Sequence, residues 1–197
     1  MKAIFIHKAK DLRISEIEPQ ALNKNEVRVK IERGGICGSD LHYFNHGGFG
    51  TNFLKEPMIL GHEVSGTILE TGNDVRGLDV GDLVAISPSQ PCDNCTFCRQ
   101  GHTNHCIDMK FYGSAMLFPH IQGAFRQEMV VNTSQCVLSN DITSAQAAMV
   151  EPLSVVLHAL KRVGQIFSKN FLVCGAGPIG LLMVQCLKAS GASNIVV

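Results

Sequence analysis

Four cysteines in one short stretch have the spacing of a metal site. Cys92, Cys95, Cys98 and Cys106 form the pattern C-x2-C-x2-C-x7-C. The two-residue gaps let successive thiolates converge on one ion, and four thiolates at about 2.3 Å complete a closed tetrahedral zinc shell. Disulfides or an iron–sulfur cluster are the alternatives, but the related ferredoxin spacing ends in C-x3-C-P. The pattern therefore favours a structural zinc site whose binding energy contributes to folding.

A second set of metal-binding residue types is dispersed. Cys37 lies in the segment GGICGSDLH, and His62 and Glu63 lie in GHE. A single cysteine is most often a small buried hydrophobic residue. A lone His-Glu pair is usually exposed or satisfied within the core. From the residues alone, it is therefore undecided whether these three side chains bind a catalytic metal.

A glycine-rich loop near the carboxyl end has a pattern typical of dinucleotide binding. It contains Gly175, Gly177, Pro178, Ile179 and Gly180. An apolar strand at 171–174 precedes the loop, and a helical stretch follows it, which is the context that a G-x-G-x-x-G motif requires. The glycines allow close approach to a pyrophosphate, and the helix N-terminus offers N–H groups to the anion. An ordinary strand-to-helix turn is the alternative.

Composition and charge narrow the class of partner. Seventeen basic residues balance seventeen acidic residues, whereas a nucleic-acid binder usually carries a basic excess. Met1–Lys10 lacks the features of a secretory signal, so we expect a cytoplasmic protein with reduced thiols. The apolar stretch Phe171–Leu187 is marginal in length for a membrane span. We therefore expect a small-molecule ligand, with no nucleic acid and no membrane.

The elements that must position these residues fall into two regions. Alternating apolar residues predict strands at 26–32, 64–70 and 83–86, and the short strands and turns indicate a small β-barrel-type domain. Helices are expected at 144–149 and from Pro152 to Gly164. The segment 171–197 then reads as strand, turn, helix and strand, the start of a doubly wound domain. We expect domains at 1–150 and 151–197. Two strands and one helix cannot cover their own sheet, so we expect a truncated chain.

The order of these motifs resembles the zinc-dependent medium-chain dehydrogenase/reductase family, in its polyol, sorbitol dehydrogenase-like branch. The segments are RGGICGSDLHYF, LGHEVSG, the cysteine quartet, FYGSAMLFPHIQGAF, EPLSV and GAGPIG. The resemblance spans essentially the whole chain. It implies an α+β and α/β protein, with a GroES-like catalytic domain followed by the start of a Rossmann domain.

The resemblance also implies roles for single residues. Cys37 and His62 match catalytic zinc ligands, and Glu63 matches a further ligand in polyol dehydrogenases. Glu151 matches a glutamate that in some relatives ligates the metal or faces it through water. Ser39 matches a hydroxyl that relays the substrate's proton, and His42 lies where that relay would reach solvent. Asp40 matches a carboxylate that holds the imidazole of His62. Tyr43 is a candidate for the substrate pocket.

These residue types suit alcohol oxidation. A zinc ion with three protein ligands keeps one open position, where an alkoxide would be stabilised before hydride passes to a nicotinamide. We expect two zinc ions per chain and NAD. NADP stays open, because the residue that selects between them would lie near position 199. The resemblance favours oxidation of L-idonate to 5-ketogluconate, with sorbitol or threonine as alternative substrates, and a homo-oligomer at full length.

Some alternatives and minor candidates accompany this interpretation. A non-catalytic zinc-stabilised scaffold is the main rival, and a zinc-ribbon nucleic-acid binder is a weaker one. This chain alone is expected to be inactive. His120 and Arg126 could meet a substrate carboxylate. Cys136, Cys174 and Cys186 are expected to be packing residues.

Overall fold

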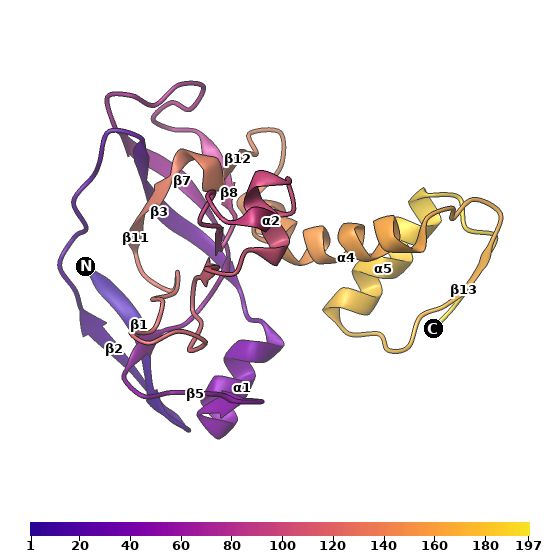
Figure 1. Cartoon of the computed structure of the whole chain (residues 1–197), viewed down its shortest axis with the longest axis horizontal. Coiled ribbons are helices and arrows are strands. Elements are labelled where there is room, and N and C mark those ends of the chain that lie inside the picture. Colours follow the sequence, from indigo (N-terminus) through magenta and orange to yellow (C-terminus); the bar gives the residue numbers. More distant parts are fainter. The chain divides into compact units, whose positions relative to one another are not determined.

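The computed structural model describes all 197 residues and divides into two compact units. The first unit is Met1–Met149 and the second is Val150–Val197. Each unit is described by itself below, with the element labels of Figure 1.

The first unit is built on a five-stranded sheet with the order β11-β3-β7-β8-β12. Its strands are β3 (Glu26–Gly35), β7 (Glu63–Thr71), β8 (Leu83–Ile86), β11 (Glu128–Asn132) and β12 (Cys136–Leu138). Every neighbouring pair is antiparallel. The strands expected at 26–32, 64–70 and 83–86 are confirmed as β3, β7 and β8.

The main core lies on one face of this sheet. Val27 and Val29 of β3 are fully buried, as their alternation with charged residues predicts. They pack with Ile68 of β7, Val84 of β8 and Met129 of β11. A fully buried side chain of this size contributes about 1.5–3 kcal/mol to folding. The core thus packs β3 and β7 against the neighbouring strands of the sheet.

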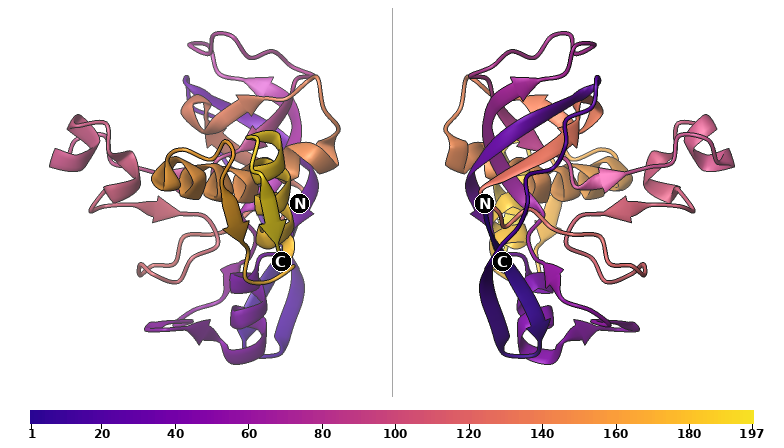
Figure 2. Two further views of the ribbon diagram at one scale, coloured as in Figure 1. Left: turned by 90° about the vertical axis from the view of Figure 1, so that its right-hand side faces the viewer. Right: turned by 90° about the vertical axis from the view of Figure 1, so that its left-hand side faces the viewer.

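A smaller sheet and the first helix form a second core. The sheet has the order β2-β1-β6 and is antiparallel, with strands β1 (Lys2–Lys8), β2 (Asp11–Glu16) and β6 (Met58–Ile59). The β1–β2 hairpin is the indigo pair at the bottom of Figure 2. Ile6, Met58 and Leu60 pack with Tyr43 of α1 (Gly38–His46). The strands form separate sheets and do not close into one hydrogen-bonded barrel.

The remaining elements of the first unit are short. They are β4 (Gly48–Phe49), β5 (Asn52–Phe53), β9 (Ser89–Gln90), α2 (Thr96–Arg99), η1 (Thr103–His105), β10 (Lys110–Phe111), η2 (Thr133–Gln135) and α3 (Ser144–Ala148). The segment between β9 and β10 projects from the sheet as a lobe in Figure 2. Thr143 caps α3, since its hydroxyl accepts the N–H of Gln146 at 3.3 Å.

The second unit has the strand-helix-strand order expected from its sequence. It comprises α4 (Val150–Val163), β13 (Asn170–Leu172), α5 (Pro178–Ala189) and β14 (Asn194–Val196), and β13 and β14 are parallel. Val156 and Leu160 of α4 pack with Val173 and with Leu187 of α5. Leu172 in β13 is 72% exposed. One face of this small sheet is therefore uncovered within the described chain.

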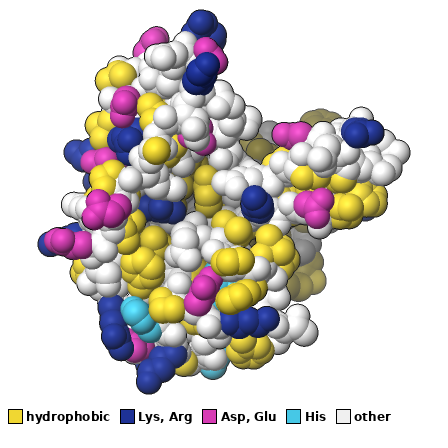
Figure 3. Space-filling view, turned by 60° about the vertical axis from the view of Figure 1, so that its left-hand side comes forward, with side chains coloured by type: hydrophobic (Ala, Val, Ile, Leu, Met, Phe, Trp, Pro, Cys, Tyr) yellow, Lys and Arg dark blue, Asp and Glu magenta, His cyan; other side chains and the backbone are white.

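The surface carries mixed charge. On the face shown in Figure 3, basic and acidic side chains are interspersed, with apolar patches between them. None of the helices combines the length and the apolar character that crossing a bilayer would need.

Candidate functional site

The pairing of β3 with β7 brings two distant sequence motifs to one end of the sheet. Gly35 pairs with Glu63 at the end of this ladder. Cys37 follows Gly35 by two residues, and His62 directly precedes Glu63. The register of the two strands thus determines that the thiol and the imidazole meet.

The ligand atoms of Cys37, His62 and Glu63 all lie within 4.8 Å of one another. We call these three residues the metal trio. Ligands bound tetrahedrally at 2.0–2.3 Å lie about 3.3–3.8 Å apart, so small side-chain movements would let the trio hold one zinc ion. Gly35 makes room for this arrangement, because a Cβ at position 35 would lie 2.2 Å from Oε2 of Glu63.

Asp40 ties the two ligand-bearing segments to each other. It lies in the first turn of α1 and is 3% exposed. Its Oδ2 accepts the N–H of Cys37 at 2.9 Å, and its Oδ1 accepts the N–H of Gly61 at 3.2 Å. A single carboxylate therefore positions the backbone next to both Cys37 and His62, which explains why a short acidic side chain occupies this position.

The pKa values of the groups in and next to the trio are shifted in ways that a bound cation would use. Hydrogen bonds from His62 and then from Ser39 lower the pKa of the Cys37 thiol, against the effect of burial. Burial raises the pKa of Glu63 and of Asp40 above the ordinary carboxyl values, and the charge of His62 opposes it in both cases. A divalent cation would stabilise the thiolate and the carboxylate together.

The structure distributes the other predicted residues unevenly around the trio. Ser39 is half-buried on α1, where its hydroxyl helps to lower the pKa of the Cys37 thiol, and His42 is exposed one turn further along. Glu151 lies in the first turn of α4 and belongs to the second unit. The roles of these three residues stay predictions.

Two aromatic residues differ from the sequence interpretation. Tyr43 is 1% exposed, and its hydroxyl oxygen accepts the N–H of Ala115 at 2.8 Å. It is therefore a core residue of the first unit. Phe111 was not singled out from the sequence, yet its ring centroid lies 5.3 Å from that of His62. Its segment FYGSAMLFPHIQGAF contributed to the family resemblance, but nothing in the sequence gave Phe111 a role, since the contact depends on where β10 lies.

The four lobe cysteines form the second cluster of ligand atoms. The sulfur atoms of Cys92, Cys95, Cys98 and Cys106 lie within 4.8 Å of one another. The N–H of Cys92 also donates to the sulfur of Cys106 at 3.2 Å. Four thiolates around one zinc ion lie about 3.8 Å apart, so the quartet fits a closed tetrahedral site.

The protonation of the quartet also suits a cation. Backbone N–H groups of Cys98 and Ile107 lower the pKa of Cys95, whereas desolvation and hydrogen bonds from neighbouring thiols raise the pKa of Cys98. Four adjacent sulfurs cannot all ionise without a positive charge between them. A divalent cation supplies that charge and would tie α2 and η1 into one lobe.

The glycine loop of the second unit connects β13 to α5. Gly177 is the N-cap of α5, and Pro178 occupies its first turn. Gly175 has φ +104°, and a Cβ on Gly180 would lie 2.0 Å from the carbonyl oxygen of Gly175. The loop geometry therefore requires glycine at both positions, and it leaves the N–H groups at the start of α5 open to an anion.

Two minor expectations change. His120 is buried, its Nε2 accepts the N–H of Lys55 at 2.9 Å, and its Nδ1 contacts the carbonyl of Leu117 at 2.8 Å. Both ring nitrogens thus serve the backbone rather than a ligand. Cys174 is exposed, so the expectation that it is a packing residue was wrong, whereas Cys136 and Cys186 are partly buried.

Comparison with known proteins gives consistent matches. The family "Alcohol dehydrogenase GroES-like domain" matches residues 23–141. The chain is 45% identical over 175 residues to L-idonate 5-dehydrogenase (NAD(P)(+)) of Escherichia coli strain K12, covering 88% of this chain and 50% of that protein. It is 39% identical over 196 residues to sorbitol dehydrogenase of Bos taurus, covering 99% of this chain and 54% of that protein.

A solved structure shows the same fold. The crystal structure of L-idonate 5-dehydrogenase from Escherichia coli matches with a TM-score of 0.92 and 41% identity, covering 98% of this chain and 56% of that chain. These matches confirm the expected GroES-like catalytic domain. The chain spans about half the length of the curated relatives it matches.

Proposed function

The chain belongs to the family of the alcohol dehydrogenase GroES-like domain, and on that premise we propose that the protein is a zinc-dependent NAD(P) oxidoreductase. It would oxidise a secondary alcohol of a sugar acid or a polyol. The observation that carries the proposal is the metal trio, in which a thiol, an imidazole and a carboxylate converge within 4.8 Å. A scaffold has no need of this combination.

Different residues of the first unit would bind the metal and transfer the proton of the reacting alcohol. When bound, zinc acts as a Lewis acid on the alcohol oxygen, and the nicotinamide accepts the hydride. Cys37, His62 and Glu63 would hold the ion, with Glu151 as an alternative carboxylate. Ser39 would take the proton from the alcohol, because its hydroxyl follows Cys37 by two residues and influences the pKa of that thiol. The exposed His42 would pass that proton to water.

L-idonate is the substrate that we favour, with oxidation at carbon 5 to 5-ketogluconate. Support comes from the relative at 45% identity, whose name states this activity. Sorbitol is the next candidate, because several relatives at 37–39% identity are sorbitol dehydrogenases. Threonine is a third candidate.

Two zinc ions per chain would serve different purposes. The quartet would bind a structural ion with no open position, and the trio would bind the catalytic ion. The glycine loop from Gly175 to Gly180 would hold the pyrophosphate of NAD, with NADP as the alternative. We place the protein in the cytoplasm, where thiols of this number stay reduced, and expect a homo-oligomer.

The 197-residue chain by itself should not catalyse alcohol oxidation. The relatives are about twice as long, and the small sheet of the second unit leaves Leu172 exposed. A nicotinamide site needs more of the doubly wound domain than two strands and one helix. Dehydrogenase turnover by these 197 residues would overturn this part of the proposal.

Metal analysis of matched cysteine variants tests the proposal. We expect two zinc ions per chain in the unaltered protein, one in Cys37→Ser, and two in Cys174→Ser, which changes an exposed thiol. In a longer chain with a complete cofactor domain, Cys37→Ser should abolish NAD reduction with L-idonate, and Cys174→Ser should retain it. Two zinc ions in Cys37→Ser, or full activity of that variant, would refute the catalytic site. A metal trio that binds zinc without any alcohol oxidation in the longer chain would favour the scaffold.

A further inference from the structure

A polar cavity lies in the first unit, apart from the metal trio. Its volume is about 640 Å³, and none of the trio residues lines it. Its walls come from the segment before β3, the start of the lobe, β11 and η2. Nearly all its lining side chains are polar, and Arg126 and Tyr112 are among them. A cavity of this size is in the range of small-molecule sites, about 300–1,000 Å³.

Arg126 gives the cavity a cation without a carboxylate partner. Its Nε donates to the carbonyl of Gly123 at 2.9 Å, Nη1 donates to Oε1 of Gln20 at 3.2 Å, and Nη2 approaches the carbonyl of Gln122 at 3.5 Å. All three acceptors are neutral. Both ion pairs of the structure involve other arginines, namely Arg13 and Arg28.

The partial burial of Arg126 makes a charge without an anionic partner unfavourable. Desolvation lowers the pKa of its guanidinium, and Tyr112 is the only titratable group that opposes the effect. A buried cation normally has an anionic partner. An arginine is also well suited to bind a carboxylate or a phosphate through two parallel N–H groups.

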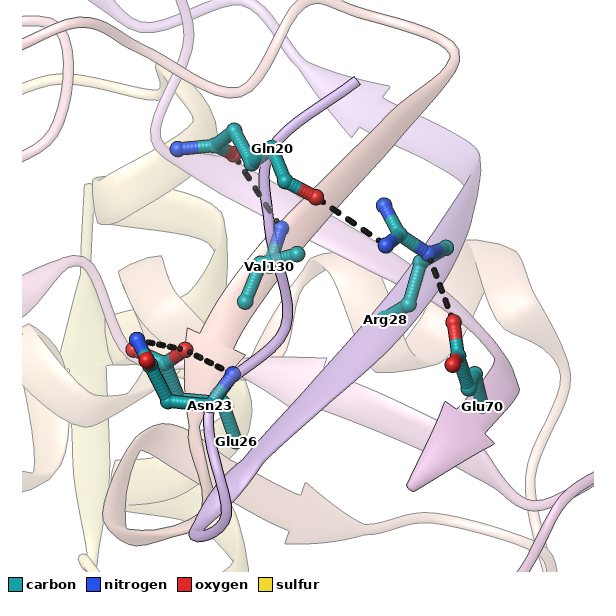
Figure 4. A network of polar contacts seen from close by, with 6 residues as sticks. All are labelled: Gln20, Asn23, Glu26, Arg28, Glu70 and Val130. Carbon is teal, nitrogen blue, oxygen red and sulfur yellow. Dashed lines mark hydrogen bonds and ion pairs between the residues drawn. The ribbon is translucent and has the colours of Figure 1, made fainter. Parts of the chain in front are cut away.

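Gln20 also lines this cavity, and the orientation of its side-chain amide is fixed. Its Oε1 accepts from both Arg126 and the N–H of Val130, the latter at 3.2 Å. These two donors fix the amide orientation, so its NH₂ group is turned away from Val130, as Figure 4 shows. The main chain of Gln20 is held in turn, because its carbonyl accepts from Arg28 at 3.0 Å. The donor is therefore preorganised.

The rest of the cavity suits hydroxyl groups. Tyr112 is buried and donates to Oε1 of Gln135 at 3.1 Å, which leaves its oxygen able to accept. Glu26 and Asp93 also line the cavity. The Glu26 carboxylate accepts from Asn23 and forms no ion pair with Arg126. Carboxylates at a distance from the cation would accept from hydroxyls of a ligand rather than neutralise the arginine.

We propose that this cavity is a second ligand site, which binds a small hydroxylated anion, a sugar acid or a sugar phosphate, with its anionic group on Arg126. The site does not depend on the proposed dehydrogenase activity. Tyr112 directly follows Phe111, whose ring packs against His62. The cavity wall at Tyr112 thus lies one residue from a neighbour of the trio, so the test below separates binding at the cavity from binding at the trio.

Calorimetric titration of the zinc-loaded 197-residue chain tests the proposal, with D-gluconate, glucose 6-phosphate and sorbitol as probes. We expect at least one of the two anions to bind at least tenfold more tightly than neutral sorbitol. Comparing gluconate with glucose 6-phosphate decides between a carboxylate and a phosphate. Arg126→Gln should weaken anion binding about ten- to hundredfold, because it removes a charged hydrogen-bonding partner.

A second variant tests the site independently, in case Arg126→Gln loses binding because it folds poorly. Gln20→Glu keeps both accepting positions of Oε1 but places a carboxylate on Arg126, so it should abolish anion binding without lowering the melting temperature. Arg13→Gln removes one exposed charge on the β1–β2 hairpin and should bind like the unaltered chain. Cys37→Ser, which disables the metal trio, should also retain binding.

Three results would overturn the proposal. One is the absence of anion binding by the unaltered chain at 20 mM ligand. Another is unchanged binding in Arg126→Gln and Gln20→Glu, which would place the ligand elsewhere on the surface. The last is loss of binding in Cys37→Ser, which would place the ligand at the metal trio.

Discussion

Replacement of Asp40 by asparagine tests whether one buried carboxylate assembles the metal trio. The two side chains have the same shape, but asparagine has one oxygen and one NH₂ group. Asp40 accepts two backbone N–H groups, those of Cys37 at 2.9 Å and Gly61 at 3.2 Å. Whichever way the amide turns, its NH₂ group faces one of these donors. One buried N–H therefore loses its acceptor.

The size of the effect follows from these contacts. An unsatisfied buried donor costs about 1–3 kcal/mol. Relief from burying a charged carboxylate, whose pKa desolvation raises, offsets part of this cost in the free energy of unfolding. Metal affinity is the sharper measurement, because the lost contact lies on the backbone that carries Cys37 or His62. Loss of such a supporting contact lowers metal affinity about 10–100-fold, which corresponds to about 1.4–2.7 kcal/mol.

Competition titration with a chromophoric chelator would measure this affinity for the trio, with the metal of the quartet counted separately by its thiolate absorption. Asp82→Asn is the matched control. Asp82 also accepts two hydrogen bonds, from the N–H of Asp79 and from Asn140, each at 2.8 Å, but it is only partly buried. If Asp40→Asn binds metal within twofold of the unaltered chain, or if Asp82→Asn weakens it equally, Asp40 does not position the trio.

Three further predictions rest on burial and close packing. Burial raises the pKa of Glu63 above its ordinary value of 4.5, so the folded metal-free chain binds this proton more tightly than the unfolded chain does. The free energy of unfolding should therefore fall as pH rises from 4.5 through the raised pKa, and Glu63→Gln should reduce this pH dependence in urea unfolding. A slope unchanged by the substitution would show that another group titrates. Burial raises the pKa of Cys136 to about 12, which leaves a thiolate fraction of about 10⁻⁴ at pH 8; mass mapping after iodoacetamide treatment should find the exposed Cys174 alkylated and Cys136 intact, and the reverse order would contradict the structure. Gly180→Ala places a Cβ 2.0 Å from the carbonyl of Gly175 and should destabilise the second unit by about 1–3 kcal/mol; an unchanged melting transition of that unit would disprove the close contact.

Short-range sequence patterns predicted much of the secondary structure. The alternation of Val27 and Val29 with charged residues predicted β3, because a strand with one buried face needs that period. The order of apolar strand, glycine loop and helix predicted the β13–α5–β14 unit. In both cases the relevant interactions lie within a few residues of each other, so the local sequence contains them.

Contacts between residues distant in the chain could not be predicted from the sequence. Tyr43 reads as a pocket residue but is buried in the core, and Cys174 reads as a packing residue but is exposed. Phe111 belongs to a segment that carries the resemblance but had no predicted role, yet it lies against His62. A side chain's surroundings depend on which segments fold onto it, and residues distant in sequence decide that.

The two clusters of candidate metal ligands show both situations. The quartet could be read from spacing alone, because its four cysteines lie on one lobe and the short chain between them limits where their sulfurs can be. The trio could not, because Cys37 and His62 are held together by the register in which Gly35 pairs with Glu63. The sequence alone determined which residues could ligate a metal. The tertiary structure decided that Cys37, His62 and Glu63 meet, since only strand pairing and the two hydrogen bonds to Asp40 bring separate segments to one point.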